Sequence, residues 1–296
     1  MSGATLRTAG RGTTGRGTEG RRIGWVDRRL ETAESGRANR TWYGGLIAAA
    51  IALAIWWVAA ASGEFSELLL PGPAKVWHAF IQSVTTHDGV KGLAGHYLWE
   101  HLAASLRRVL IGLIWGTVAG VPLGLLIGLS RIADRILGPA VDFFKALPPL
   151  GYFPLLILWF GIDDSSKVWL LFLAAFAPIT IATAAGVGNV RHERVSAVLV
   201  LGAGRYELIR TVVLPSVAGD MITGLRLASG FSWTTIVAAE SVNGTPGLGG
   251  LAWASQRELR ADIAILAVIV IGLTAISIDA ALRLVERRVA PWRGRA

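Results

Sequence analysis

Long apolar windows are the feature of this chain that most limits what it can fold into. Five windows approach the roughly 20 residues needed to cross the hydrocarbon core of a bilayer. They cover residues 43–61, 109–129, 168–187, 221–239 and 263–282. These windows lack the polar residue at every third or fourth position that a helix of a soluble core would show. The sequence therefore predicts an all-α membrane protein.

A sixth window, residues 138–160, is interrupted by charge and proline. It contains Asp142, Lys145 and the pair Pro148 and Pro149. Proline removes a backbone donor and clashes with the preceding turn, so we expect a spanning helix whose first half is broken or kinked. The predicted total is six transmembrane helices.

Basic residues are distributed unevenly between the two sides of these windows. With the N-terminus inside, 21 of the 29 Lys and Arg residues fall in inner segments and seven in outer ones. This positive-inside pattern predicts that both termini are cytoplasmic. Arg226 lies within a span, so we expect it either to find a partner or a wet cavity, or to lie at the inner interface. Arg107 and Arg108, at the predicted outer end of the second span, either snorkel to the interface or belong to a longer helix.

The chain divides into three predicted regions. Residues 1–40 carry nine arginines among Gly, Thr and Ser and few large apolar residues, which is typical of a disordered cytoplasmic tail. Residues 41–290 form the six-helix domain, with a loop at 190–215, and residues 291–296 form a cytoplasmic C-terminal tail. The net charge of +9 belongs to the tail and inner loops, which disfavours nucleic-acid binding. The chain has no cysteine, which excludes disulfides, thiolate metal sites and a cysteine nucleophile.

The second apolar window carries glycines at strict intervals of four residues. They are Gly112, Gly116, Gly120, Gly124 and Gly128. At about 100° per residue this spacing forms one ridge on a helix, and small residues on such a ridge let another helix approach closely in lipid. We expect a tight helix crossing, either within one chain or between subunits.

A glycine-broken amphipathic segment follows the fourth window. Residues 190–201 are expected to form a helix that ends at Gly202, and Gly204 permits a left-handed turn. A second helix is expected from Arg205 until Pro215 ends it before the fifth span. Its apolar face is predicted to hold Tyr206, Leu208, Ile209, Val212 and Val213. Such a segment is too polar to span a bilayer and is typical of contact with another protein.

This loop resembles the cytoplasmic loop of permease subunits of bacterial ABC importers. The family pattern is Glu-Ala-Ala, three residues, Gly, nine residues, Ile, one residue, Leu-Pro. The matching positions are Ala197, Gly202, Leu214 and Pro215, with Val212 in place of the isoleucine. The chain departs at Ser196, for the glutamate, and at Val198, for the second alanine. An ionic contact of that glutamate therefore does not carry over, whereas the helix, turn and helix pattern does.

Three further segments are similar to the subgroup that imports taurine, alkanesulfonates, nitrate and related small anions. They are residues 104–130, 146–167 and 224–241, and the closing residues 286–294 are most similar to taurine permeases. The resemblance implies a permease subunit for taurine or a related small sulfonate in the cell inner membrane. It also implies a homodimer, two ABC ATPase subunits on the cytoplasmic side and an extracytoplasmic substrate-binding protein.

The resemblance places contact with the ATPase on the loop, which would then contain a coupling helix. The residues concerned are Ser196, Ala197, Gly202, Ala203, Gly204, Arg205, Tyr206, Glu207, Leu214 and Pro215. None of the four lysines follows a glycine, as the lysine of a phosphate loop would. We therefore expect no ATPase site and no cofactor in this chain, with ATP used by the partner subunits.

Candidate residues for the substrate path lie near the end of the fifth span. They are Ser232, Trp233, Thr234, Thr235 and Glu240. A sulfonate needs hydrogen-bond donors, and the ammonium of taurine needs an acceptor. Ser and Thr equally often bond their own helix, and Trp often marks a membrane interface. The turn at residues 243–250 either gates the outer mouth or simply connects two elements.

Other functions find less support. His96 and His101 are five residues apart, which is not a common metal-ligand interval, and Asp163 and Asp164 are expected to be solvated or to cap a helix. A secondary transporter is the alternative and would be expected to carry inverted repeats and charges deep in the bundle. A permease for nitrate, alkanesulfonate or another small anion also stays open, because specificity is expected to rest on the external binding protein.

Overall fold

The structure is a computed structural model that describes residues 44–45, 47–87 and 89–290. The predicted tails, residues 1–40 and 291–296, lie outside the described residues. The chain divides into two units, residues 1–64 and 65–296. The described part of the first unit contains a short apolar helix, Ile47–Ala61, at the position of the first predicted span.

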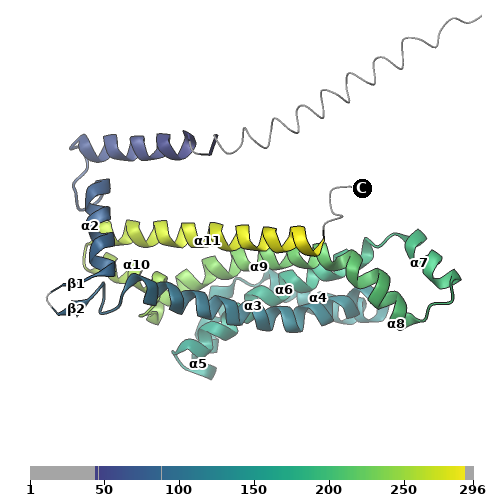
Figure 1. The fold of residues 1–296 in the computed structure, drawn as a ribbon. Coiled ribbons are helices and arrows are strands. Elements are labelled where there is room, and N and C mark those ends of the chain that lie inside the picture. Colours follow the sequence, from purple (N-terminus) through teal and green to yellow (C-terminus); the bar gives the residue numbers. More distant parts are fainter. Residues whose placement is uncertain (1–43, 46, 88, 291–296) are drawn as a thin grey trace, which may run out of the picture. The chain divides into compact units, whose positions relative to one another are not determined.

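The second unit is helical apart from one small hairpin (Figure 1). Its first elements are α2 (Pro73–Val84), β1 (Thr86–His87), β2 (Val90–Lys91), α3 (Leu98–Leu129), α4 (Arg131–Ala146), α5 (Pro149–Phe160) and α6 (Asp164–Gly188). Then follow α7 (His192–Val200), α8 (Arg205–Leu208), the π-helical turn η1 (Ile209–Val213), α9 (Leu214–Asn243), α10 (Leu248–Arg257) and α11 (Ala261–Val289). Strand β1 pairs antiparallel with β2.

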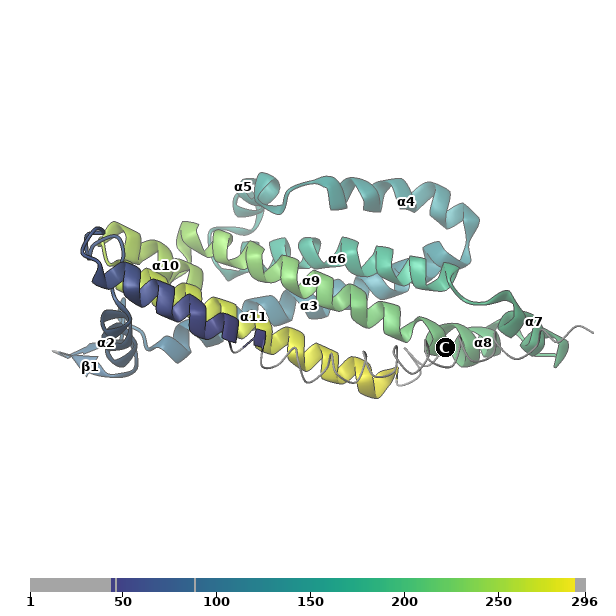
Figure 2. The ribbon, with the colours of Figure 1, turned by 90° about the horizontal axis from the view of Figure 1, so that it is seen from above.

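Four long helices, α3, α6, α9 and α11, run side by side as a bundle (Figures 1 and 2). Each is long and apolar enough to cross a membrane, when α9 is taken together with α8 and η1. Helices α4 and α5 are bent by 97° and form either one broken span or a re-entrant loop. The predicted break of the sixth window is thus confirmed at Pro148, and the described part of the second unit holds four candidate spans, or five with the bent pair. The total of six stays a prediction.

The glycine ridge of α3 packs against α6 within the same chain. A Cβ placed on Gly116 would lie 2.8 Å from the Cβ of Ala175, and one on Gly124 would lie 2.5 Å from the carbonyl oxygen of Thr180. Both separations are shorter than real Cβ contacts, so only glycine allows this approach of the two helices. Of the two alternatives left open by the sequence, the ridge therefore makes the crossing within one chain.

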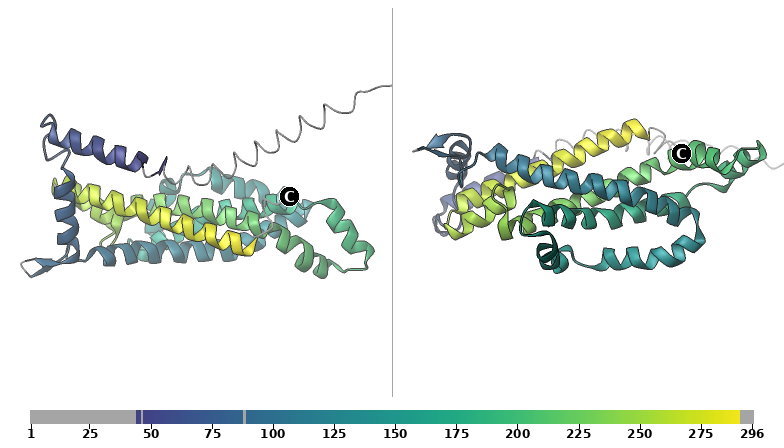
Figure 3. Two further views of the ribbon diagram at one scale, coloured as in Figure 1. Left: turned by 45° about the horizontal axis from the view of Figure 1, so that its top comes forward. Right: turned by 90° about the horizontal axis from the view of Figure 1, so that it is seen from below.

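At one end of the bundle the chain leaves α6 for α7 and α8 (Figures 1 and 3). Helix α7 ends in a Schellman turn, because the N–H of Ala203 donates to Val198 O and that of Gly202 to Leu199 O. Gly202 has φ +84 and Gly204 has φ −74. The predicted stop at Gly202 is confirmed. The left-handed residue, however, is Gly202 itself rather than Gly204, because the Schellman bonds require that conformation at the first residue after the helix.

The prediction that Pro215 separates a short helix from the fifth span is wrong. Helix α8, η1 and α9 form one continuous helix from Arg205 to Asn243. In the π turn the N–H of Leu214 reaches back five residues to Ile209 O, which widens the helix just before the proline. The wider turn accommodates a residue that has no N–H to donate, so the helix continues. Tyr206, predicted on the apolar face, is exposed, whereas Val212 and Val213 are buried.

The opposite end of the bundle carries α2, the β1–β2 hairpin and α10 (Figure 1). Helix α10 was not expected from the sequence, where residues 243–250 suggested only a turn. Its first residues, Leu248 and Gly249, are buried, and the connection from α9 is held by side chains of α3.

Candidate functional site

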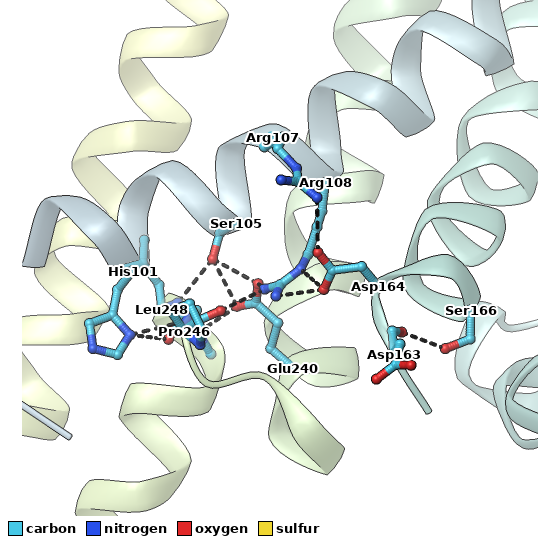
Figure 4. Close-up of polar contacts among 12 residues, drawn as sticks. His101, Ser105, Arg107, Arg108, Asp163, Asp164, Ser166, Glu240, Pro246 and Leu248 are labelled. Atoms are coloured by element: carbon cyan, nitrogen blue, oxygen red, sulfur yellow. Dashed lines mark hydrogen bonds and ion pairs between the residues drawn. The ribbon is translucent and has the colours of Figure 1, made fainter. Parts of the chain in front are cut away.

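A buried polar cluster ties helices together at the α10 end, and Arg108 of α3 is its centre (Figure 4). The residue is 4% exposed. Its Nε donates to Asp164 Oδ1 of α6 at 2.7 Å, and its Nη1 donates to Glu240 Oε1 of α9 at 2.6 Å. Nη1 also donates to the carbonyl oxygen of Pro246 at 2.9 Å. One guanidinium therefore joins α3, α6, α9 and the turn that leads to α10.

Glu240, which is 1% exposed, has both carboxylate oxygens satisfied. Besides Arg108, it accepts from the Ser105 hydroxyl, whose Oγ lies 2.8 and 2.9 Å from the two oxygens, and from the N–H of Gly249 at 2.9 Å. Ser105 Oγ in turn accepts from the N–H of Leu248 at 2.9 Å. A charge pair removed from water is tolerated when its remaining lone pairs are hydrogen-bonded, and this pair meets that condition.

His101, one helical turn before Ser105 on α3, also contacts the turn that leads to α10. The N–H of Gly247 lies 3.0 Å from its Nδ1, and its Nε2 lies 3.1 Å from Leu93 O. A neutral ring that carries its proton on Nε2 satisfies both contacts, because Nδ1 then accepts and Nε2 donates. The ring thus serves as a link between two backbone segments.

The cluster decides between two alternatives for Arg107 and Arg108 and corrects the expectation for Asp164, all at the predicted outer ends of the spans. Helix α3 begins at Leu98, so Arg107 and Arg108 belong to a longer helix, one of the two alternatives considered. Asp164 was expected to be solvated or to cap a helix, but it pairs with Arg108 and lies 3.4 Å from Arg107. Asp163 is the N-cap residue of α6 and makes no side-chain cap bond. Glycines and a proline around residue 246 hinted at a turn, but no local signal pointed to its contacts with α3.

Arg226 has ion-pair partners, one of the alternatives that its position within a span left open. Its Nε donates to Asp279 Oδ1 at 2.9 Å and its Nη1 to Glu286 Oε2 at 3.0 Å, both on α11. Asp279 also pairs with Arg283. This group links α9 to α11 in the half of the bundle nearer α7.

The predicted substrate-path residues are spread around α9. Trp233 is buried and its Nε1 donates to Ile271 O at 3.0 Å, whereas Thr234 is exposed and bonds carbonyl oxygens of its own helix. Ser232 is fully buried, and its Oγ is the one buried side-chain polar atom without a partner among the described residues. Thr235, three residues after Ser232, is also buried. Glu240 is buried in the cluster around Arg108.

A pocket of about 410 Å³ with a mixed apolar and charged lining lies between α3, α4 and α6, toward the α7 end. Arg131, Asp134 and Asp142 of α4 and Thr180 of α6 contribute its polar groups. The volume and the presence of both charge signs suit a small polar solute. The sequence pointed to the charges on this segment but not to their gathering around a cavity.

The turn between α7 and α8 exposes an unusual amount of apolar surface. Val200 is 86% and Leu201 84% exposed, and Leu199 and Tyr206 are also exposed. The N–H of Gly204 donates to Glu207 Oε2 at 3.1 Å, which caps α8 and makes the turn a defined structure. An ordered apolar tip of this kind is typical of a surface that another protein covers. The predicted coupling residues are thus gathered on one projecting end of the unit.

Length, hydropathy and packing define this chain as a polytopic helical membrane protein. Residues 120–291 match the family of binding-protein-dependent transport system inner membrane components, so the chain belongs to that family, the permease subunits of ABC importers. It is 37% identical over 245 residues to the taurine transport system permease protein TauC of Escherichia coli strain K12, covering 83% of this chain and 88% of that one.

Other relatives carry neighbouring specificities in their names. The putative aliphatic sulfonates transport permease protein SsuC of Escherichia coli is 34% identical, covering 81% of this chain and 88% of that protein. The nitrate import permease protein NrtB of Leptolyngbya laminosa is 34% identical, covering 66% of this chain and 70% of that protein. The predicted subgroup of taurine, sulfonate and nitrate permeases is confirmed.

A solved structure of the MetNI methionine ABC transporter in an inward-facing conformation has the same fold. The TM-score is 0.56 at 18% sequence identity, over 65% of this chain and 95% of that one. At this identity the likeness concerns the fold alone. It agrees with the assignment of the bundle to the importer permease type.

Proposed function

We propose that this chain is the translocating subunit of an ATP-driven importer for taurine or a related small sulfonate. The relatives named for taurine and sulfonate transport support the solute class. ATP is used by separate subunits, and this chain binds no cofactor of its own. Growth on taurine, butanesulfonate or nitrate as sole sulfur or nitrogen source, in a strain that lacks the gene, tests the solute. If the strain without the gene still takes up all three solutes as the wild type does, the proposed solute class is contradicted.

The proposed topology has six spans and two cytoplasmic termini. Helix Ile47–Ala61 supplies the first span and the bent pair α4 and α5 supplies the third. The excess of Lys and Arg in the inner segments supports this orientation. The α7–α8 turn then faces the cytoplasm, and the α10 end faces the extracytoplasmic binding protein.

The exposed apolar tip at Val200 and Leu201 is the observation that carries the coupling proposal. In a twofold dimer, closure of two ATPase subunits would push the two α7–α8 turns together and favour an outward-open arrangement of the bundle. Such a change needs two packings that differ by only a few kcal/mol. Because α8, η1 and α9 are continuous, a push on the turn is transmitted along one rigid element. Ser196 in place of the family glutamate makes apolar contact the main part of this interface.

Two glycines in this turn provide a matched test. Gly202 has φ +84, where a β-branched residue costs about 1–3 kcal/mol. Gly204 has φ −74, and a Cβ there would meet no atom within 4 Å. We expect Gly202→Val to retain ATP hydrolysis in the assembled complex and to lose uptake, because the Schellman turn that presents the tip is distorted. Gly204→Val should stay close to wild type. Wild-type coupling in Gly202→Val would contradict the proposal.

Ser232 is the strongest of the proposed substrate-path residues, because its buried hydroxyl has no partner in the described chain. Ser232→Ala should leave the stability of the protein unchanged or slightly raised, since no hydrogen bond is lost. If the hydroxyl meets solute, the same variant should raise the KM for uptake. Ser277→Ala is the control, because Ser277 is exposed on α11 and its hydroxyl donates to Leu273 O of its own helix. Identical uptake kinetics in both variants would remove Ser232 from the path.

A secondary transporter is the alternative, and it differs in its energy source. Proteoliposomes that contain the chain with its ATPase subunits and binding protein should accumulate solute only with ATP. Uptake driven by a proton or sodium gradient in the chain alone would favour the alternative.

A further inference from the structure

Helix α2 has an exposed apolar flank that the bundle does not cover. It lies at the α10 end and runs across the direction of α3, α6, α9 and α11, as Figures 1 and 3 show. Trp77 is 64% exposed and Ile81, one turn later, is also exposed. The helix begins with Pro73 in its first turn, so its start is defined by the sequence.

The side chains of α2 divide into three sectors when projected at about 100° per residue. The buried sector, which faces the bundle, holds Val76, Ala79 and Ser83. The second sector is apolar and holds Ala74, Trp77, Phe80, Ile81 and Val84. The third is polar and holds Lys75, His78 and Gln82. The helix therefore has an apolar edge and a polar edge on the two sides of its contact with the protein.

This three-sector pattern fits a helix that lies in the plane of a membrane surface. A helix that crosses the ends of the spans and packs on them along one sector turns one remaining edge toward the hydrocarbon and the other toward water. An apolar edge with tryptophan suits the first environment, and an edge with lysine and histidine suits the second. An apolar edge left in water would instead keep Trp77 and Ile81 hydrated without compensation.

Other aromatic residues at the same end support a boundary at this level. Trp99, in the first turn of α3, and Trp253, in α10, are both exposed. The ring of Trp99 stacks on Tyr97 with centroids 4.3 Å apart. Tryptophan and tyrosine gather at the headgroup level of bilayers because their rings are apolar and carry one polar atom. Trp77 of α2 thus belongs to a wider set of exposed aromatic side chains at this end of the bundle.

The contact between α2 and the spans is specific. The Arg260 guanidinium donates to Gln82 Oε1 at 3.0 Å and to Asp262 Oδ2 at 2.7 Å. Arg260 directly precedes α11, so α2 is fixed to the start of a span. A force on α2 from the membrane surface is therefore passed to α11.

We propose that α2 is an interfacial helix whose apolar edge, Trp77 and Ile81, lies at the boundary of headgroups and acyl chains in the leaflet at the α10 end. The partner is the lipid itself. The helix sets how deeply this end of the bundle lies in the membrane and keeps the hairpin and α10 at the water surface. The inference needs only that α3, α6, α9 and α11 span the bilayer. It stands or falls independently of the proposed solute.

The chain has no cysteine, so single-cysteine variants report without background. Trp77→Cys and Ile81→Cys place a nitroxide label on the apolar edge, and His78→Cys places one on the polar edge of the same helix. The full-length chain is reconstituted in liposomes, and each label is tested for collision with oxygen, which concentrates in lipid, and with a water-soluble nickel chelate. We expect labels at 77 and 81 to collide preferentially with oxygen and the label at 78 with nickel.

Two outcomes would overturn the proposal. If all three labels favour nickel, α2 stands in water. If labels at 77 and 81 are shielded from both reagents, a protein surface covers the edge. Shielding in the chain alone indicates a second copy, and shielding that appears only after the binding protein is added indicates the binding protein. If Trp77→Cys fails to insert, the labels at 78 and 81 still test the proposal, because His78 lies on the polar edge and Ile81 on the apolar edge of the same helix.

Discussion

The buried pair of Arg108 and Glu240 should dominate the stability of the α10 end. Replacing Arg108 with Met removes the 2.6 Å ion pair and leaves Glu240, whose side chain is fully buried, without its ion-pair partner. Breaking a buried pair in this way typically costs 3–5 kcal/mol. Glu240 keeps its bonds from Ser105 and Gly249, so we expect the lower end, about 3 kcal/mol.

The neighbouring Arg107 is the matched control. Its side chain is 69% exposed and lies 3.4 Å from Asp164. Exposed pairs contribute about 0–1 kcal/mol, so Arg107→Met should change the free energy of unfolding by less than about 1 kcal/mol. The free energies can be measured by circular dichroism as the purified chain unfolds in mixed micelles with a rising mole fraction of sodium dodecyl sulfate.

A double variant separates loss of the pair from loss of packing. Arg108→Met combined with Glu240→Gln removes both charges of the pair, so neither Arg108 nor Glu240 leaves the other as an unpaired buried charge. Its loss of unfolding free energy should be smaller than the sum of the losses in the two single variants by about 2 kcal/mol. Equal effects of Arg108→Met and Arg107→Met, or strict additivity in the double variant, would refute the view that the buried charge pair holds this end together.

Two further pairs of variants test the contacts between helices of the bundle by the same unfolding measurement. Gly124→Ala brings a Cβ to 2.5 Å from the Thr180 carbonyl oxygen and should cost about 1–3 kcal/mol, whereas Gly230→Ala meets no atom within 4 Å and should stabilise by up to about 1 kcal/mol; equal effects would show that the ridge is not tightly packed. Arg226→Gln, at an arginine side chain 27% exposed, should cost about 2 kcal/mol, between the values typical of surface and buried pairs, and the more exposed Arg283→Gln should cost less. The reverse order would contradict a central role for Arg226.

Features that depend on residues close in the chain could be predicted from the sequence. The apolar windows indicated the long helices, because a bilayer requires about 20 apolar residues in a row. The glycine spacing indicated the ridge of α3, because helix geometry alone places every fourth residue on one face. The charge at Arg226 indicated a partner, a wet cavity or a place at the inner interface, without deciding among them. Gly202 was correctly predicted to end α7.

Features that depend on distant residues could not be predicted in this way. The π turn before Pro215 was missed because a proline in a pattern favours a helix end, and only the wider turn lets the helix continue. Helix α10 was missed because its glycines favour a turn. Its first residues are held by the Ser105 hydroxyl and the Glu240 carboxylate, from two other helices.

From the sequence alone it follows that this chain spans a membrane, that one apolar window breaks at Pro148 and that the loop helix ends at Gly202. The sequence also shows which helix carries a small-residue ridge and which family the chain belongs to. Those properties follow from apolar length, period and local motifs. The tertiary structure decided that the ridge meets α6 and that Arg108 joins Asp164 and Glu240. It also decided that α2 lies across the spans with one apolar edge exposed. These outcomes depend on which helices lie side by side, and the burial of a charge is tolerated only when a partner from another helix arrives at hydrogen-bond distance.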